Sequence, residues 1–196
     1  TVDAHYKRTA MALPVGVSAV NTDAEAQYKH TSQLLDECLV LGSRFTEHAP
    51  TWEDLAWLRG QTDKPILVKG IVSPADAKQA LALGANGLVV SNHGGRVLDT
   101  GIPPLTALQL IKKAVPADFP LLYDGGIRRG SDVFKAIALG ASAVLIGRPA
   151  IYGLASAGAL GVAHVIKILK EEFEITMALM GTARIDEINQ DFIFQK

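Results

Sequence analysis

The sequence predicts an α/β fold, most simply part of a (β/α)8 barrel, and three observations support this. A strand–helix–strand pattern occurs twice along the chain. The expected strands are continuously apolar, as in parallel sheets that are covered by helices. Polar residues follow the expected strands at their carboxyl ends, where barrel active sites are built. A complete barrel needs about 250 residues, whereas this chain has 196. We therefore expect it to cover strands 5–8 and the end of strand 4.

The repeat supplies the four expected strands. Residues 65–91 read PILVKGIVSPADAKQALALGANGLVVS, and residues 120–147 read PLLYDGGIRRGSDVFKAIALGASAVLIG. Each copy opens with proline and a short apolar strand that ends in a polar residue. The second strand of each copy lies at residues 87–90 or 143–146. The two copies therefore predict two strand–helix–strand units of one parallel sheet.

The helices within the repeat have recognisable ends. We expect them to begin at Ser73 and Ser131, because serine is a good N-cap. Both end at Leu-Gly-Ala, which places Gly84 and Gly140 just beyond the last helical residue.

Further helices are expected between and around the copies. One near residues 104–114 links them, one near 52–59 precedes them and one at about 158–180 follows. Residues 1–50 are expected to hold the end of strand 4, then a long loop with one helix at 31–41, and residues 51–196 the rest of the same domain. An open doubly wound sheet has the same order of elements, but no Gly-x-Gly-x-x-Gly follows a strand here, which favours the TIM barrel.

The composition predicts an ordinary soluble domain, with 48% hydrophobic residues, 20% charged residues and a formal net charge of −1. With so little net charge, the chain has no positive electrostatic potential that would favour binding to nucleic acid or to an anionic membrane. The single cysteine, Cys38, cannot form a disulfide within the chain, so we expect a reducing compartment and a cytoplasmic protein. No apolar run approaches the roughly 20 residues that span a bilayer, so we expect no membrane helix. We also expect no metal site.

The run Ser-Asn-His-Gly-Gly-Arg at residues 91–96 is the main catalytic candidate. His93 leaves the carboxyl end of a strand, and the two glycines let a ligand approach the backbone. Arg96 offers a planar fork for a carboxylate. Oxidation of a 2-hydroxy acid requires this pair, because the arginine fixes the acid while the imidazole takes the hydroxyl proton. The alternative is a surface turn with an incidental histidine and arginine.

Other polar residues belong to the same expected edge. Lys69 ends the preceding strand, and three roles remain open for it: a Schiff-base nucleophile, a phosphate or flavin contact, or an ion-pair partner of a carboxylate. Asp3 could accept the other imidazole N–H of His93 if it lies at the end of strand 4. Glycine-rich turns followed by a helix bind phosphate, and the candidates for this are Gly125, Gly126, Arg128, Gly147 and Arg148, with Asp124 on a ribityl hydroxyl.

These motifs together resemble the FMN-dependent α-hydroxy-acid dehydrogenase family, which includes glycolate oxidase, lactate oxidase, flavocytochrome b2 and (S)-mandelate dehydrogenase. The resemblance runs from about Thr51 to the C-terminus. Its motifs are Leu-Val-Lys-Gly at 67–70, Ser-Asn-His-Gly-Gly-Arg at 91–96, Asp-Gly-Gly-Ile-Arg-Arg-Gly at 124–130 and Ile-Gly-Arg-Pro at 146–149. It implies FMN as cofactor, a small 2-hydroxy-acid substrate, and a homo-oligomer (a tetramer in the family). The electron acceptor, whether oxygen, quinone or cytochrome, stays open.

The resemblance also implies roles by position. Lys69 and Ser91 match flavin contacts, His93 matches the base, and Arg96 matches the arginine that binds the substrate carboxylate. The segment from Asp124 to Arg128, with Gly147 and Arg148, resembles the ribityl and phosphate site.

The N-terminal residues match less completely. Thr1 would contact the flavin, Asp3 would orient His93, and Arg8 is a possible second substrate arginine at an altered spacing. Val97 replaces the glutamine that usually follows the histidine–arginine run, and the family's strands 1–3 are absent.

Three hypotheses follow. The first is oxidation of an (S)-2-hydroxy acid to the 2-oxo acid, with the rest of the barrel supplied by a longer parent, a second chain or self-association. The second is a non-catalytic half-barrel that keeps the phosphate site. The third is another FMN- or phosphate-binding barrel enzyme, against which the His-Gly-Gly-Arg run argues.

Overall fold

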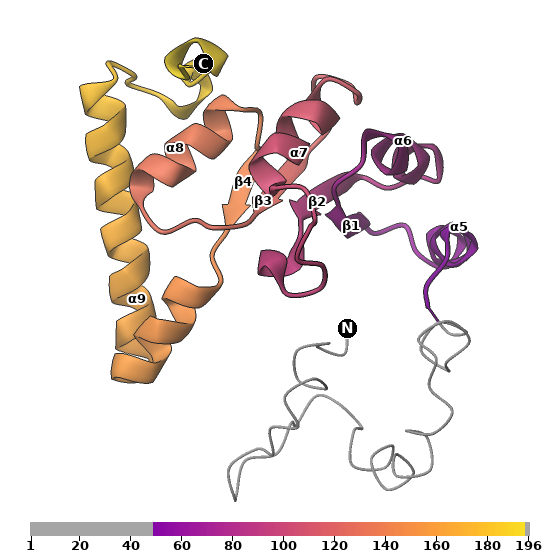
Figure 1. The fold of residues 1–196 in the computed structure, drawn as a ribbon, viewed down its shortest axis with the longest axis horizontal. Helices are drawn as coiled ribbons and strands as arrows, with labels where there is room; N and C mark the ends of the chain where they lie inside the picture. The colour runs from indigo at the N-terminus through magenta and orange to yellow at the C-terminus, as the bar shows by residue number, and fades with distance from the viewer. Residues whose placement is uncertain (1–48, 195–196) are drawn as a thin grey trace, which may run out of the picture. The chain divides into compact units, whose positions relative to one another are not determined.

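The computed structural model describes residues 49–194, and these contain one four-stranded sheet. Contacts divide the chain into two compact units, Thr1–Leu55 and Ala56–Lys196; the sheet lies in the second. All neighbouring strands are parallel and their order follows the chain (Figure 1). The strands are β1 (Leu67–Ile71), β2 (Gly87–Ser91), β3 (Leu121–Asp124) and β4 (Ala143–Leu145). Consecutive order is that of a barrel, whereas a doubly wound sheet reverses its order at a switch point.

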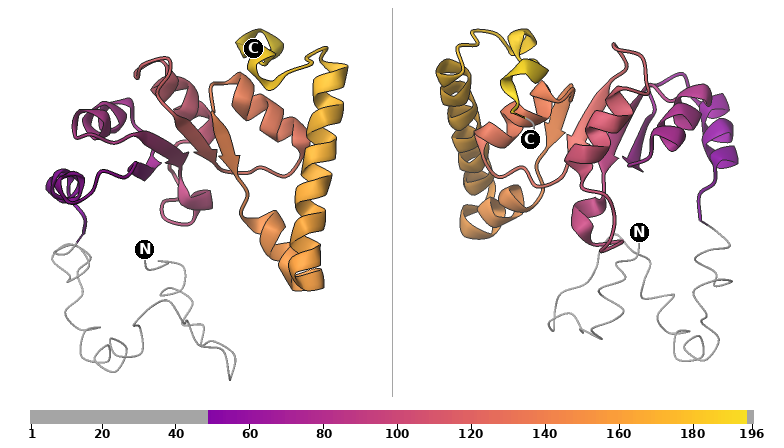
Figure 2. Two further views of the ribbon diagram at one scale, coloured as in Figure 1. Left: turned by 180° about the vertical axis from the view of Figure 1, so that it is seen from behind. Right: turned by 45° about the horizontal axis from the view of Figure 1, so that its top comes forward.

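Helices connect each pair of strands and lie on one face of the sheet (Figures 1 and 2). Right-handed crossovers between consecutive parallel strands require this arrangement. The connecting helices are α6 (Pro74–Ala82), α7 (Pro104–Lys112) and α8 (Gly130–Ala138). Helix α5 (Trp52–Gln61) comes before the sheet, and α9 (Arg148–Leu179), η2 (Ile185–Glu187) and η3 (Gln190–Phe192) come after it. The predicted helices near 52–59 and 104–114 are therefore confirmed.

The main core lies between the sheet and these helices. Leu88, Val90 and Leu121 point to the helical side and are fully buried, as are Ala107 and Ile111 of α7. The opposite face is more open at the edge strands, where Leu67 of β1 is 48% exposed. Strand β2, which has a strand on each side, is buried throughout. The apolar strands predicted from the repeat are thus confirmed as a helix-covered parallel sheet.

The helix ends follow the predicted signals with one exception. Ser73 caps α6, and its hydroxyl accepts a hydrogen bond from the N–H of Ala75. Gly84 and Gly140 both take positive φ just after their helices, as the glycine stop signals predicted. The prediction for Ser131 was wrong, because α8 begins one residue before it, at Gly130.

Helix α9 consists of two parts joined by a break. Ala157 and Gly158 leave helical geometry, with φ −152° and +56°, so residues 148–156 form a short helix and 159–179 a long one. The predicted helix from 158 corresponds to the long part; the short helix was missed because its glycines and alanines carry little periodic signal. The two parts meet at Gly153 and Gly161, where a Cβ on Gly153 would lie 2.6 Å from the Gly161 carbonyl oxygen.

Helix α9 bears on the expectation that no apolar run approaches the roughly 20 residues of a membrane span. Residues 149–166 contain no Asp, Glu, Lys or Arg, and α9 includes an 18-residue window of mean hydropathy 1.5 that is 6% buried. By length and composition α9 therefore qualifies as a candidate membrane span, although the break at Ala157 and Gly158 divides that stretch into two rods.

Candidate active site

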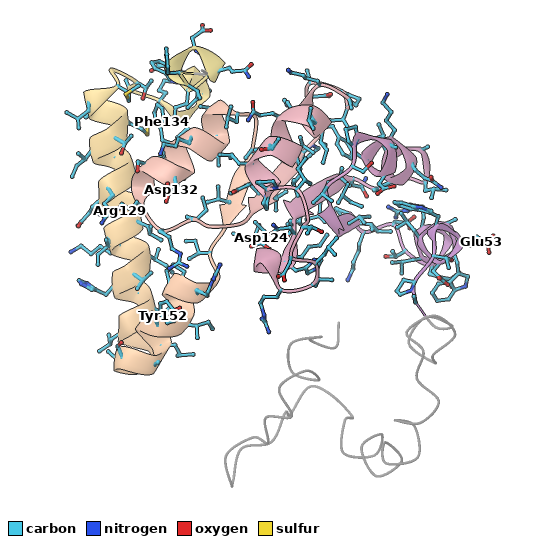
Figure 3. The ribbon with its side chains drawn as sticks, viewed as in Figure 1. Glu53, Asp124, Arg129, Asp132, Phe134 and Tyr152 are labelled. Carbon is cyan, nitrogen blue, oxygen red and sulfur yellow. The ribbon has the colours of Figure 1, made fainter. Side chains whose placement is uncertain are left out.

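Three polar side chains from adjacent strands meet at the carboxyl end of the sheet. Register pairs Lys69 with Val89 and Ser91 with Asp124, so side-chain alternation puts Lys69, Ser91 and Asp124 on the face away from the helices. Lys69 Nζ lies 2.9 Å from Asp124 Oδ2 and 3.2 Å from Ser91 Oγ. The Ser91 hydroxyl donates to Asp124 Oδ2 at 2.7 Å. Figure 3 labels Asp124 at the end of β3.

Ser91 is the centre of this network. Its side chain is 1% exposed, and its Oγ also accepts a hydrogen bond from the backbone N–H of His93 at 3.0 Å. One hydroxyl has one proton and two acceptor sites. Ser91 uses all three, and so fixes Lys69, Asp124 and the start of the next turn relative to one another.

The environment keeps Asp124 ionised. Burial by itself raises the pKa of its carboxyl, but hydrogen bonds from Lys69 and Ser91 and the electrostatic influence of Lys69 and His93 outweigh burial and hold that pKa below its usual value. The edge therefore carries a carboxylate neutralised by an ammonium group whose side chain stays 42% exposed. An ammonium group so placed can face a further anion.

His93 has the most constrained backbone of the site. Its φ is +55°, and it is the one non-glycine residue among those described with positive φ. Such conformations cost free energy and concentrate at functional sites. Its ring lies on Gly70, where a Cβ would come within 2.7 Å of Cε1. Gly70 itself takes φ +97° at a register shift between Lys69 and Ile71. A bulge and a glycine in β1 thus make room for the imidazole.

The turn after His93 is held by its own backbone and by Asn92. Residues His93–Gly95 form the 3-10 turn η1, in which Asn92 Oδ1 accepts from the N–H of Gly95 at 3.2 Å. Arg96 follows as the exposed last residue of the turn. The side chain of Arg148, from the start of α9, reaches this turn, since a Cβ on Gly94 would lie 3.8 Å from Nη2. Two segments with candidate roles are therefore adjacent in space.

The glycine-rich turn before α8 is less open than its sequence indicated. Asp132 Oδ2 accepts from the N–H groups of Arg128 and Arg129 at 3.1 and 3.0 Å. Glu172 Oε2, from α9, accepts from the N–H of Gly130 at 2.9 Å. Protein carboxylates thus already occupy the helix terminus that could attract a phosphate.

Open backbone remains nearby at two glycines. A Cβ on Gly126, at φ +72°, or on Gly147 would meet no atom within 4 Å. Gly147 begins α9 without a side-chain cap. The side chains of Arg128 and Arg148 are both exposed. Gly147 and Arg148 thus offer accessible backbone at a helix start and a guanidinium group, both of which can bind a phosphate. Gly126 and Arg128 offer open backbone and a guanidinium group in the turn before α8.

Some predicted residues lie outside the described part of the chain, namely Thr1, Asp3 and Arg8. Sequence reasoning missed Gly70, Asn92 and Glu172. The first two had a signal, because a glycine inside a strand indicates a bulge and an asparagine before a turn indicates a cap. The role of Glu172 depends on a contact 42 residues away along the chain. Within residues 49–194 no group of three His, Cys, Asp or Glu side chains could hold a metal ion.

Comparison with known proteins supplies the context for this geometry. The model of a family described as FMN-dependent dehydrogenase matches residues 4–195, a longer stretch than the motifs alone covered. The chain is 53% identical over 151 residues to peroxisomal (S)-2-hydroxyacid oxidase GLO3 of Arabidopsis thaliana, covering 77% of this chain and 42% of that protein. It is 53% identical over 144 residues to an L-lactate oxidase of Alicycliphilus denitrificans, covering 74% of this chain and 40% of that protein.

Solved structures agree with the sequence matches. The structure of mandelate oxidase with (S)-2-phenylpropionate is 40% identical, with a TM-score of 0.76, over 94% of this chain and 48% of that chain. The structure with (S)-4-hydroxymandelic acid is 46% identical, with a TM-score of 0.70, over 72% of this chain and 40% of that chain. The chain therefore spans less than half the length of the proteins it matches.

Proposed function

The chain belongs to the FMN-dependent dehydrogenase family, and from this premise we propose that it carries the residues that oxidise an (S)-2-hydroxy acid to the 2-oxo acid. By this relationship the parallel sheet is part of a TIM-barrel enzyme fold. We assign β1–β4 to strands 5–8 of that barrel, with the end of strand 4 before residue 50. The single observation that carries the proposal is the constrained position of His93 at the carboxyl end of the sheet. Its ring packs against Gly70, and its backbone N–H donates to the Ser91 hydroxyl.

His93 has the geometry of a general base. Its backbone N–H donates to Ser91 Oγ, and its ring packs against Gly70. We expect the imidazole to take this position before a substrate binds. It takes the proton of the substrate hydroxyl while Arg96 binds the carboxylate. The hydrogen on the hydroxyl carbon would leave with the bonding electron pair for FMN, which would supply the acceptor, so that this carbon becomes a carbonyl. The nearby Asp124 carboxylate stabilises the imidazolium that forms, since the two groups interact electrostatically. Asp3 would add a second carboxylate, and Arg8 a second arginine.

The residues of the edge fit an FMN molecule. Lys69 would face the electron-rich side of the ring system, and Ser91 and Asp124 would contact its polar atoms. Arg128 and Arg148, with backbone at Gly126, Gly147 and Gly125, would hold the phosphate, and Thr1 would contact the flavin from strand 4. FMN, when bound, supplies the two-electron acceptor that amino-acid side chains lack.

The test is anaerobic reduction of the full chain loaded with FMN. A short 2-hydroxy acid such as lactate or glycolate should bleach the flavin absorbance. His93→Gln should still bind FMN but bleach at least about a hundredfold more slowly, the usual contribution of a general base. His164→Gln, an exposed histidine of α9, should behave as the wild type. Bound FMN that no 2-hydroxy acid reduces would refute the proposed function.

One observation favours the half-barrel alternative. The outer edges of β1 and β4 have no partner strand among residues 49–194, and an unpaired edge leaves backbone groups and apolar side chains exposed. Under this alternative the chain by itself would bind FMN weakly and turn nothing over. Mass measurement in solution with and without FMN separates the two, since the enzyme proposal includes a homo-oligomer that retains flavin. A cytoplasmic location remains part of the proposal.

A further inference from the structure

The turn between β3 and α8 is fixed by a residue from another helix. Three successive N–H groups, of residues 128–130, are bound by two carboxylates, Asp132 within α8 and Glu172 in the long part of α9. Asp132 lies in the first turn of α8, directly after these residues. Glu172 is the one of these two acceptors that ties the turn to the rest of the fold.

Glu172 also binds one of the two arginine side chains in this turn. Its Oε1 lies 3.3 Å from Arg129 Nη1, so the Arg129 side chain extends toward α9 (Figure 3). Arg129 has extended backbone, with φ −135° and ψ 160°. Arg128 comes directly before it; its backbone N–H donates to Asp132, and its side chain is exposed.

Helix α9 approaches the turn as closely as two backbones can. A Cβ on Gly130 would lie 2.7 Å from the Glu172 Cβ and closer still to the backbone at Phe173. Near this contact Phe134 of α8, Met177 of α9 and Ile188, which follows η2, form a small hydrophobic core. The ring centroids of Phe134 and Phe192 lie 5.8 Å apart in an edge-to-face contact. The position of Glu172 is therefore rigidly coupled to α8.

The same long helix supports the other phosphate candidate. Residues 148–156 pack on it through Gly153 and Gly161, and they begin with Gly147 and Arg148. The long part of α9, residues 159–179, thus contacts both segments that carry the candidate arginines, Arg128 and Arg148.

We propose that Glu172 is a positioning residue for phosphate binding: by binding the N–H of Gly130 and the Arg129 side chain it fixes the turn that carries Arg128, the candidate arginine for the flavin phosphate. This rests on the proposed function, and it adds a residue that touches neither flavin nor substrate. Loss of Glu172 should weaken binding of the phosphate specifically. A merely structural role would lower stability without changing which flavin is preferred.

The experiment measures dissociation constants of FMN and of riboflavin, which lacks the phosphate, for the full chain. Wild type should prefer FMN. In Glu172→Ala the preference should fall by about tenfold, the factor that corresponds to one hydrogen bond to a charged group. Glu172→Gln keeps an acceptor for the Gly130 N–H and should lie between the two. Glu171→Ala removes a neighbouring carboxylate that pairs within the helix with Lys167, and should keep the wild-type preference.

A second measurement needs no flavin. Amide hydrogen exchange of residues 126–132 should speed up in Glu172→Ala and stay unchanged in Glu171→Ala, because a buried amide without its acceptor exchanges faster. Faster exchange with an unchanged FMN-to-riboflavin preference would overturn the positioning role, as would exchange that does not change. Wild type that shows no preference for FMN while exchange responds to Glu172 would instead count against the proposed function, and would leave Glu172 a purely structural residue.

Discussion

Replacing Ser91 by alanine should destabilise the chain through the loss of one hydroxyl. The side chain is 1% exposed, and its Oγ bonds Lys69 at 3.2 Å, Asp124 at 2.7 Å and the His93 N–H at 3.0 Å. Lys69 and Asp124 keep each other at 2.9 Å, so the main cost is the bond to the charged carboxylate, about 1.5–3 kcal/mol, and the unsatisfied N–H, about 1–3 kcal/mol. These two contributions add to about 2.5–6 kcal/mol. Because the Asp124 and Lys69 side chains are partly exposed and water can replace their bonds, we expect a total near the lower end, about 3 kcal/mol.

Urea unfolding followed by circular dichroism measures this cost. The midpoint should fall while the slope of free energy against urea stays the same, because the surface exposed on unfolding does not change. For a chain of this size the melting temperature should fall by roughly 6–12 °C. Ser142→Ala is the matched control at an exposed serine and should cost less than about 0.5 kcal/mol. If Ser91→Ala costs no more than this control, the central role given to the hydroxyl is refuted.

Three further predictions concern backbone room and charge. Gly70 has φ +97°, and a Cβ there would lie 2.7 Å from His93 Cε1. Gly70→Ala should therefore lower the free energy of unfolding by about 1–3 kcal/mol and shift the His93 ring resonances in NMR spectra. Unshifted resonances would show that the ring does not pack against Gly70. Gly130→Ala should cost about 1–3 kcal/mol in urea unfolding because its Cβ would enter the α9 backbone, whereas Gly60→Ala, with open space around it, should cost nothing. The pKa of Asp124 is lowered from its usual value in the folded chain, so its carboxylate stabilises the fold above the unfolded pKa and that contribution disappears as pH falls through the folded pKa. The free energy of unfolding should therefore fall more steeply below about pH 5 in wild type than in Asp124→Asn, and parallel pH profiles would contradict the assignment.

Much of the candidate site could be predicted because its signals are local. Residues that end consecutive parallel strands share one edge, so the repeat alone indicated that Lys69, His93 and Asp124 would lie near one another. The sequence also held the signals for Ser73 as a cap and for Gly84 as a stop. It did not reveal that the amides before α8 are already bound, because one of the two acceptors comes from a helix 42 residues further on.

The sequence by itself determined the parallel α/β fold, the family and the edge of the sheet where the polar candidate residues lie. These depend on periodicity, on glycine and proline signals and on short motifs, all of which act over a few residues. The tertiary structure decided three contacts: the packing of the His93 ring against Gly70, the hydrogen bond from the Ser91 hydroxyl to Asp124, and the hydrogen bond from the Gly130 N–H to Glu172. Such contacts join residues that are distant along the chain, and they exist only when packing at close distance fixes which side chain reaches which partner.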